Sequence, residues 1–152
     1  MAIVKTDVPM TSQLCESTID ALLEAYPYFR SENLTTTAFG RPVRTLVIGN
    51  GDRKVIFSAA HHANEWITTP LLLKFAEELA EAADNGGKIW GVDGQTVLKA
   101  VTIYLIPMVN PDVAISIKIR WYNLYTLTIC GASAGLLLRL PRPCGPRNDT
   151  LF

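Results

Sequence analysis

The spacing of the apolar residues predicts two amphipathic helices. The first begins at Thr11 or Ser12, either of which can cap it, and ends near Tyr26-Pro27, because a residue before proline disfavours the helical conformation. The second runs from about residue 66 to residue 84. Its predicted buried stripe comprises Leu71, Leu72, Phe75, Ala76, Leu79 and Ala80. Its predicted exposed face comprises Lys74, Glu77, Glu78 and Glu81.

Four shorter segments have the composition of strands: 34–39, 43–49, 54–60 and 101–106. The third contains the continuous apolar run Val55-Ile56-Phe57, which predicts a central strand covered on both faces. The glycine-containing stretch between the second helix and the fourth strand is predicted to be a loop. Helices and strands in this succession place the chain in the α/β class. The charges predicted to be solvated at the edge of the sheet are Arg41 and Arg44.

Length and composition are those of one ordinary globular domain, but the charge is unevenly divided. The 152 residues are enough to bury a core, and a formal net charge of zero gives no reason to expect a nucleic-acid partner. Residues 1–112 hold 9 Lys and Arg against 13 Asp and Glu, a net charge of −4. Residues 113–152 hold 5 against 1, a net charge of +4.

The cysteines and the N-terminus say little about chemistry. Cys15, Cys130 and Cys144 are scattered and form no Cys-x-x-Cys pair, which predicts neither a disulfide framework nor a thiolate zinc cluster. Residues 1–7 contain no apolar segment of the kind found in a secretory signal. The localisation is therefore unknown, and a cytoplasmic one is the default expectation.

The candidate chemistry lies in residues 55–66, where the third strand leads towards the second helix. His62 and Glu65 stand three residues apart, so a first helical turn would place their side chains on the same side. An imidazole and a carboxylate are two of the three protein ligands expected at a hydrolytic zinc ion. The alternative is a histidine that donates to a backbone carbonyl, while Glu65 caps the helix at the positive end of its dipole.

Two motifs resemble those of the zinc carboxypeptidases. Residues 59–70, AAHHANEWITTP, resemble the first zinc motif of this family, especially in the bacterial γ-D-glutamyl-L-diamino acid endopeptidases, which cut peptidoglycan stem peptides. Asn64 agrees with that branch, whereas the digestive branch has arginine there. Residues 106–112, IPMVNPD, resemble the region of the family's Asn-Pro-Asp-Gly turn, with Val113 in place of the glycine. The resemblance covers roughly residues 10–112 and implies the N-terminal half of a three-layer α/β fold with a mixed sheet.

The resemblance implies a zinc-dependent hydrolase of peptide bonds, with His62 and Glu65 as the first two Zn²⁺ ligands and no ligand role for His61. In such an enzyme zinc polarises the scissile carbonyl and lowers the pKa of its bound water to about 7, and a glutamate acts as general base. No histidine follows His62 and no glutamate follows Glu81, so the third ligand and the late catalytic glutamate have no counterpart. We therefore predict no catalytic residue in this chain and little or no activity.

The tail, residues 113–152, does not resemble the family. Residues 121–138 carry no charge between Arg120 and Arg139, and 18 residues are just enough to span a thin bilayer. Their several polar residues and two glycines nevertheless make this run only moderately apolar. We favour an out-of-frame C-terminus, with a membrane or partner helix and a divergent native ending as the alternatives.

Two functions therefore stay open. One is a truncated zinc metallopeptidase that acts on peptide or peptidoglycan-derived substrates. The other is a non-catalytic α/β binding module, with residues 121–138 as a membrane tether, although membrane contact is not the favoured expectation. Because the family's sheet continues further, we also expect an apolar edge beside the fourth strand, 101–106, and self-association through that edge.

Overall fold

The computed structural model describes residues 2–112. The predicted domain boundary at residue 112 coincides with the end of the described residues. All predictions for the tail, including those for the uncharged run 121–138, lie outside them. The elements follow one another in the order α1 (Ser12–Ala25), β1 (Phe29–Thr36), β2 (Pro42–Ile48), β3 (Arg53–Ser58), the 3₁₀ turn η1 (Ala63–Glu65), α2 (Thr68–Asp84), β4 (Lys88–Ile89), β5 (Val92–Asp93), α3 (Gly94–Ala100) and β6 (Val101–Ile106).

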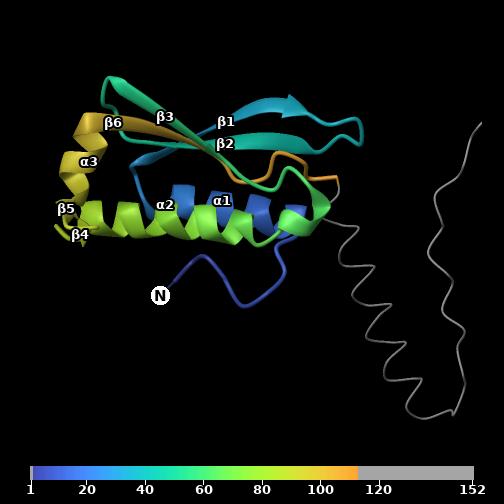
Figure 1. The fold of residues 1–152 in the computed structure, drawn as a ribbon, viewed down its shortest axis with the longest axis horizontal. Coiled ribbons are helices and arrows are strands. Elements are labelled where there is room, and N and C mark those ends of the chain that lie inside the picture. The colour runs from blue at the N-terminus through green and yellow to red at the C-terminus, as the bar shows by residue number, and fades with distance from the viewer. Residues whose placement is uncertain (1, 113–152) are drawn as a thin grey trace, which may run out of the picture.

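Four strands form a mixed sheet in the order β1-β2-β6-β3. The β1–β2 and β2–β6 pairs are antiparallel, whereas β3 and β6 are parallel and joined by a crossover that contains α2. The predicted α/β class and the mixed sheet are therefore confirmed. Helices α1 and α2 lie on one face of this sheet and α3 stands at its end, so two of the three implied layers are present in the described residues (Figure 1).

The hydrophobic core lies between the sheet and helices α1 and α2. Its fully buried side chains come from both layers and include Ile19, Leu22, Leu46, Leu73, Leu79 and Leu105. Burial of this apolar area is the main favourable contribution to the stability of the two layers. Among the described residues, no helix is long and apolar enough to cross a membrane.

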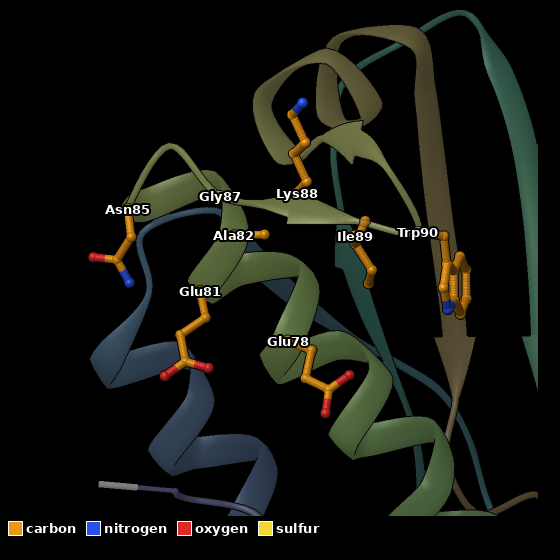
Figure 2. Close-up of a pocket in the computed structure, with 8 residues that line it drawn as sticks. All are labelled: Glu78, Glu81, Ala82, Asn85, Gly87, Lys88, Ile89 and Trp90. Atoms are coloured by element: carbon orange, nitrogen blue, oxygen red, sulfur yellow. The ribbon is translucent and has the colours of Figure 1, made fainter.

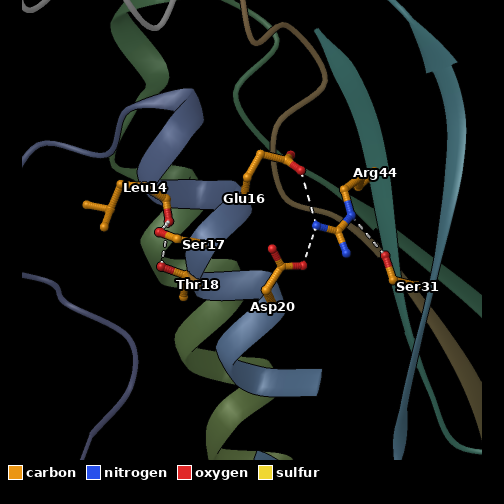
Figure 3. A network of polar contacts seen from close by, with 7 residues as sticks. All are labelled: Leu14, Glu16, Ser17, Thr18, Asp20, Ser31 and Arg44. Atoms are coloured by element: carbon orange, nitrogen blue, oxygen red, sulfur yellow. Dashed lines mark hydrogen bonds and ion pairs between the residues drawn. The ribbon is translucent and has the colours of Figure 1, made fainter. Parts of the chain in front are cut away.

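Helix α1 begins where the sequence predicts and is fastened to the sheet by an ion-pair network. The Leu14 N–H donates to Thr11 Oγ1 at 3.1 Å, which caps the helix. Arg44 of β2 donates from one nitrogen to Asp20 at 2.7 Å and to Glu16 at 3.2 Å, and from Nε to Ser31 (Figure 3). Arg44 is therefore a bridge between strand and helix, and the prediction of a solvated edge charge is wrong.

Strand β3 is not central, because β6 lies between it and β2. Among the described residues, β3 pairs only with β6, and Ile56 and Phe57 are both exposed. The predicted coverage of β3 on both faces is therefore wrong, since an apolar run does not reveal whether its neighbours are present. The expected free edge beside residues 101–106 is wrong for the same reason: β6 has a partner on each side, and within residues 2–112 the edge strands are β1 and β3.

Helix α2 begins at Thr68, two residues later than predicted, because residues 63–65 form the separate turn η1. Ala76, Leu79 and Ala80 of the predicted stripe are fully buried, whereas Leu71 is exposed and Leu73 is buried in its place. Glu77, predicted to face solvent, is only 1% exposed. Its carboxylate accepts hydrogen bonds from the Ile3 N–H and from Lys74 Nζ. The N-terminal segment packs over the helix and buries this side chain.

Two further boundaries differ from the sequence-based expectation. The first strand spans Phe29–Thr36 instead of 34–39, because its exposed, polar residues carry little apolar alternation. The stretch predicted to be a loop forms the β4–β5 hairpin and helix α3. Asp93 caps α3 by accepting from the Thr96 N–H at 2.8 Å, and this hydrogen bond lowers the pKa of Asp93.

Candidate metal centre

The two sequence motifs meet at the carboxyl ends of the parallel strands β3 and β6. The Val109 N–H donates to the Ala59 carbonyl at 2.9 Å, and the Asn110 N–H donates to the Ala60 carbonyl at 3.0 Å. These backbone bonds hold the Asn-Pro-Asp turn against the segment that leads to the histidines. Carboxyl ends of adjacent parallel strands are common locations for binding sites in α/β sheets.

The turn after β3 is held by the first residue of α2. Ala60 has a φ of +51°, a left-handed conformation that is uncommon for a residue with a Cβ. Its N–H donates to Thr68 Oγ1 at 2.9 Å, and the Thr68 hydroxyl donates to the Glu65 carbonyl at 2.7 Å. The next residue, Thr69, is buried and donates to the Pro107 carbonyl. These contacts fix the direction in which residues 61–65 leave the strand.

His62 and Glu65 face each other, with 2.8 Å between Nδ1 and Oε1. The second carboxylate oxygen accepts the backbone N–H groups of His61 and His62, each at 3.1 Å. The pKa of Glu65 is lowered, chiefly by the hydrogen bond from the His62 side chain and then by that from the His62 backbone. Glu65 is therefore ionised at neutral pH, and it also caps the η1 turn, which was the alternative role predicted for it.

The donor set of this pair fits a zinc ion. Tetrahedral zinc with nitrogen and oxygen ligands at about 2.1 Å holds these two atoms roughly 3.4 Å apart. The observed separation of 2.8 Å is that of a hydrogen bond and would have to widen by about 0.6 Å. Both side chains are accessible, at 77% exposed for His62 and 37% for Glu65. The pair can therefore open without disturbing the core.

The rest of the described chain supplies no complete ligand set. His61 places Nε2 at 3.0 Å from Ser58 Oγ, so its ring contacts the end of β3. Within residues 2–112, no cluster of three or more histidine, cysteine, aspartate or glutamate side chains is arranged to hold a metal. His62 and Glu65 are thus brought together as predicted, but no third ligand joins them in the described residues.

Asp112 links the Asn-Pro-Asp turn to the loop between β1 and β2. Its Oδ1 accepts from Arg41 Nη1 at 2.7 Å and from the Thr37 hydroxyl at 2.9 Å. Arg41 is therefore ion-paired and only partly solvated, and the prediction of a solvated edge charge did not include this pairing. The sequence reasoning missed this contact because neither spacing nor periodicity relates residues 71 positions apart.

An apolar groove of about 460 Å³ lies beside the histidine turn, between β3 and α2. Its lining includes Phe57, Ala59, Leu71, Phe75 and Trp90. Phe75 stacks on Trp90 with ring centroids 5.6 Å apart and meets Phe57 edge-on at 5.9 Å. No sequence pattern indicated a role for Trp90 in this groove, because its position depends on the β4–β5 hairpin, which was not predicted.

The far side of Trp90 borders a second, more polar hollow of about 450 Å³ (Figure 2). Glu78 and Glu81 of α2 project into this region from the same side of the helix. Both glutamates are exposed, so an acidic surface adjoins the apolar groove at Trp90.

Sequence comparison connects this architecture with known proteins. Residues 15–116 match the family model described as zinc carboxypeptidase. Gamma-D-glutamyl-L-diamino acid endopeptidase 1 of Lysinibacillus sphaericus is 35% identical over 94 residues, which cover 62% of this chain and 24% of that protein. The chain spans about a quarter of the length of the curated relatives that it matches.

Solved structures show the same fold at low sequence identity. Thrombin activatable fibrinolysis inhibitor has a TM-score of 0.64 at 18% identity, over 75% of this chain and 29% of that one. Carboxypeptidase A from Helicoverpa armigera has a TM-score of 0.58 at 18% identity, over 71% of this chain and 26% of that one. The family match extends over most of the chain and includes both motifs that meet at the ends of β3 and β6. The chain belongs to the zinc carboxypeptidase family.

Proposed function

We propose that this chain carries the His62–Glu65 half of a zinc site in a hydrolase that cuts peptide bonds of peptidoglycan stem peptides. The observation that carries the proposal is the 2.8 Å contact between Nδ1 and Oε1 at the carboxyl end of β3. Both residues lie within the segment 15–116, which matches the zinc carboxypeptidase family model. Family membership supports the hydrolase role, and the ligand assignment and the substrate are the proposed parts.

The residues around the pair would prepare it to bind a metal. The carboxylate of Glu65 accepts three hydrogen bonds, which lower its pKa and favour its ionised form. The bonds from Thr68 and from Asn110 to the turn keep the pair at the end of the sheet. Zinc, when bound, would supply a Lewis acid for the scissile carbonyl and a water of lowered pKa. Within this chain the role of His62 and Glu65 is to hold that ion.

The substrate class rests on the relative from Lysinibacillus sphaericus, which is named as a γ-D-glutamyl-L-diamino acid endopeptidase. Asn64, next to Glu65, is the residue that the sequence resemblance associates with the same branch. A γ-D-glutamyl bond to a diamino acid is therefore the proposed target. Such a bond is an amide, so metal-assisted hydrolysis is the corresponding chemistry.

This polypeptide alone is expected to be a poor enzyme. A catalytic zinc ion normally has three protein ligands, and here His62 is the last histidine of the sequence. The late glutamate that serves the family as general base is also absent, since Glu81 is the last glutamate. We therefore infer that catalysis requires residues beyond those of this chain.

A chimeric enzyme tests the proposed role of the pair. The matched stretch of the Lysinibacillus sphaericus endopeptidase is replaced by the 94 aligned residues of this chain, and hydrolysis of a γ-D-Glu-diaminopimelate peptide is measured. The chimera should hydrolyse the peptide, lose activity with a chelator, and lose it again when His62→Ala is introduced. The matched control is His61→Ala, which should retain activity. Equal losses from the two substitutions would contradict the assignment.

The alternative, a non-catalytic binding module, is favoured by one observation, the incomplete ligand set within residues 2–112. In that case the isolated chain would bind peptidoglycan fragments without any dependence on zinc. Binding that is unchanged by chelator and by His62→Ala would support this alternative. Binding that requires zinc would support the metal site.

A further inference from the structure

The chain contains the dipeptide Asn-Gly twice, at Asn50-Gly51 and at Asn85-Gly86. In this dipeptide the asparagine side chain reacts readily with the backbone, because glycine places no side chain in the way of the following nitrogen. Folding puts the two copies in different surroundings. The first lies in the turn between β2 and β3, and the second lies where α2 ends and the chain continues to β4.

We propose that Asn85 is a site of spontaneous deamidation in the folded chain and that Asn50 is protected from it. In this reaction the backbone nitrogen of Gly86 attacks Cγ of Asn85 and closes a succinimide ring. The side-chain nitrogen leaves as ammonia and takes the proton of the Gly86 N–H. Water then opens the ring at either carbonyl and leaves aspartate or isoaspartate at position 85. The reaction needs only water, and the proposal is independent of the zinc site.

Asn85 lies at an exposed helix end that can open locally. Asn85 and Gly86 are both exposed, and a Cβ placed on Gly86 would meet no atom within 4 Å. Figure 2 shows the Asn85 side chain in the loop beyond the last turn of α2. The Asn85 N–H donates to the Glu81 carbonyl at 3.0 Å. The Gly87 N–H donates to the Ala82 carbonyl at 2.8 Å, and these two bonds hold the loop.

The attacking nitrogen can move when the helix end frays. Within residues 2–112, the N–H of Gly86 donates to no acceptor, so it has no hydrogen bond of its own to lose. The Ala83 carbonyl, its usual acceptor at a glycine-ended helix, accepts from Gln95 Nε2 at 2.9 Å. The last turn of a helix opens more easily than the core, and glycine adopts a wide range of φ. The rotation at Asn85 that brings this nitrogen to Cγ is therefore accessible.

The Asn50-Gly51 turn is fixed by packing. Gly51 is buried, and a Cβ there would overlap the backbone of Ala100. The Asn50 N–H donates to the Leu98 carbonyl at 2.9 Å. The Gly51 carbonyl accepts from the buried Thr102 Oγ1 at 2.7 Å. Turning the Gly51 nitrogen towards the Asn50 side chain would break these contacts with α3 and β6, so this copy is protected while the sheet is folded.

Deamidation adds a negative charge at the carboxyl end of α2. That end is the negative pole of the helix dipole, and Glu81 lies one turn earlier, so both repel the added carboxylate. Asn85 and Glu81 also line the polar hollow beside Trp90, which becomes more acidic. The modification therefore weakens the helix end and changes the charge of one surface of the molecule.

Peptide mass spectrometry of the full 152-residue chain in heavy-oxygen water tests the proposal. Ring opening takes one oxygen from water, so heavy oxygen marks each deamidation that occurs during the incubation. The conversion rates of Asn85 and Asn50 are measured in the folded chain and in urea, where the rates correct for the flanking sequence. We expect folding to slow Asn50 by at least about tenfold more than Asn85. Equal slowing of the two, or no heavy oxygen at position 85 in the folded chain, would overturn the proposal.

Two variants at position 85 separate the reaction from its consequence. Asn85→Gln lengthens the side chain by one methylene, which disfavours ring closure, so the label should disappear at this position and persist at Asn50 in urea. Asn85→Asp reproduces the charge of one product and should speed hydrogen exchange of the last turn of α2 about two- to fivefold relative to Asn85→Gln. A label that persists at position 85 in Asn85→Gln would overturn the assignment. Equal exchange in the two variants would overturn the effect of the charge.

Discussion

Arg41 and Asp112 form an ion pair at 2.7 Å that joins the loop between β1 and β2 to the Asn-Pro-Asp turn after β6. The same carboxylate accepts from Thr37, so one side chain fastens two segments that are distant in the sequence. The Asn-Pro-Asp turn supports the histidine segment through the backbone hydrogen bond from Asn110 to Ala60. The position of the candidate metal pair therefore depends on contacts made well outside the zinc motif.

A double-mutant cycle should detect this pair. Arg41→Ala and Asp112→Ala should each destabilise the chain, and their coupling energy should be about 0.5–1 kcal/mol, because both side chains are partly solvated. The free energy of unfolding in urea provides the measurement. Strict additivity of the two substitutions would show that the pair contributes nothing.

Glu77 should be far more important for stability than its neighbour Glu78. Removing the buried carboxylate in Glu77→Ala leaves the Ile3 N–H and Lys74 without their acceptor, which should cost about 2–3 kcal/mol. Exposed Glu78→Ala is the control and should change stability by less than about 0.5 kcal/mol. Hydrogen exchange of the N-terminal residues should accelerate only in Glu77→Ala. Similar effects of both substitutions would contradict the observed packing.

Trp90 has a φ of +48°, so its backbone is strained and its ring compensates by stacking on Phe75. Trp90→Ala should lose the stacking and keep the strain, whereas Trp90→Gly should lose both. We therefore expect Trp90→Gly to be the more stable of the two variants by about 1 kcal/mol. Thermal unfolding of the two variants measures this difference. A more stable alanine variant would show that the conformation at residue 90 is not strained.

Cys15 should be unreactive while the chain is folded. Burial, and secondarily the charge of Glu16, raise the pKa of this thiol from 9.0 to about 12. The folded state therefore holds the proton more tightly than the unfolded state. The resulting contribution to stability is fully present below pH 9 and is lost as the pH rises towards 12.

Alkylation with iodoacetamide at pH 8, followed by peptide mass spectrometry, checks the thiol directly. Modification of Cys15 should be at least about a hundredfold slower in the folded chain than in urea. Glu16→Gln, which removes the secondary cause, should change the rate only slightly. Rapid modification of Cys15 in the folded chain would mean that α1 does not bury it.

The sequence predicted the elements whose signals are local. The Thr11 cap, the end of α1 near Tyr26 and the strand Val101–Ile106 all lie where the pattern indicated. The facing of His62 and Glu65 follows from their spacing at the end of a strand, and the structure shows that contact. These features depend on residues within one or two turns of each other, so a single sequence contains the information.

The features that the sequence did not predict depend on distant contacts. Glu77 is buried because the N-terminal segment packs over it, and β3 is at an edge because β6 inserts beside β2. The helical pattern of α2 predicted the burial of Ala76, Leu79 and Ala80 correctly, but it wrongly placed Leu71 in the core and Glu77 in solvent. In each case the partner lies tens of residues away, and hydrophobic periodicity carries no information about it.

Zinc binding by the full chain tests the central claim, that His62 and Glu65 form a metal pair. Equilibrium dialysis is performed after alkylation of the accessible cysteines, so that thiolates do not contribute. We expect one zinc ion per chain, bound weakly, with the affinity lowered about tenfold or more by His62→Ala and by Glu65→Ala but retained in His61→Ala. Zinc binding that is absent in the unaltered chain, or that is equally sensitive to His61→Ala, would contradict the claim.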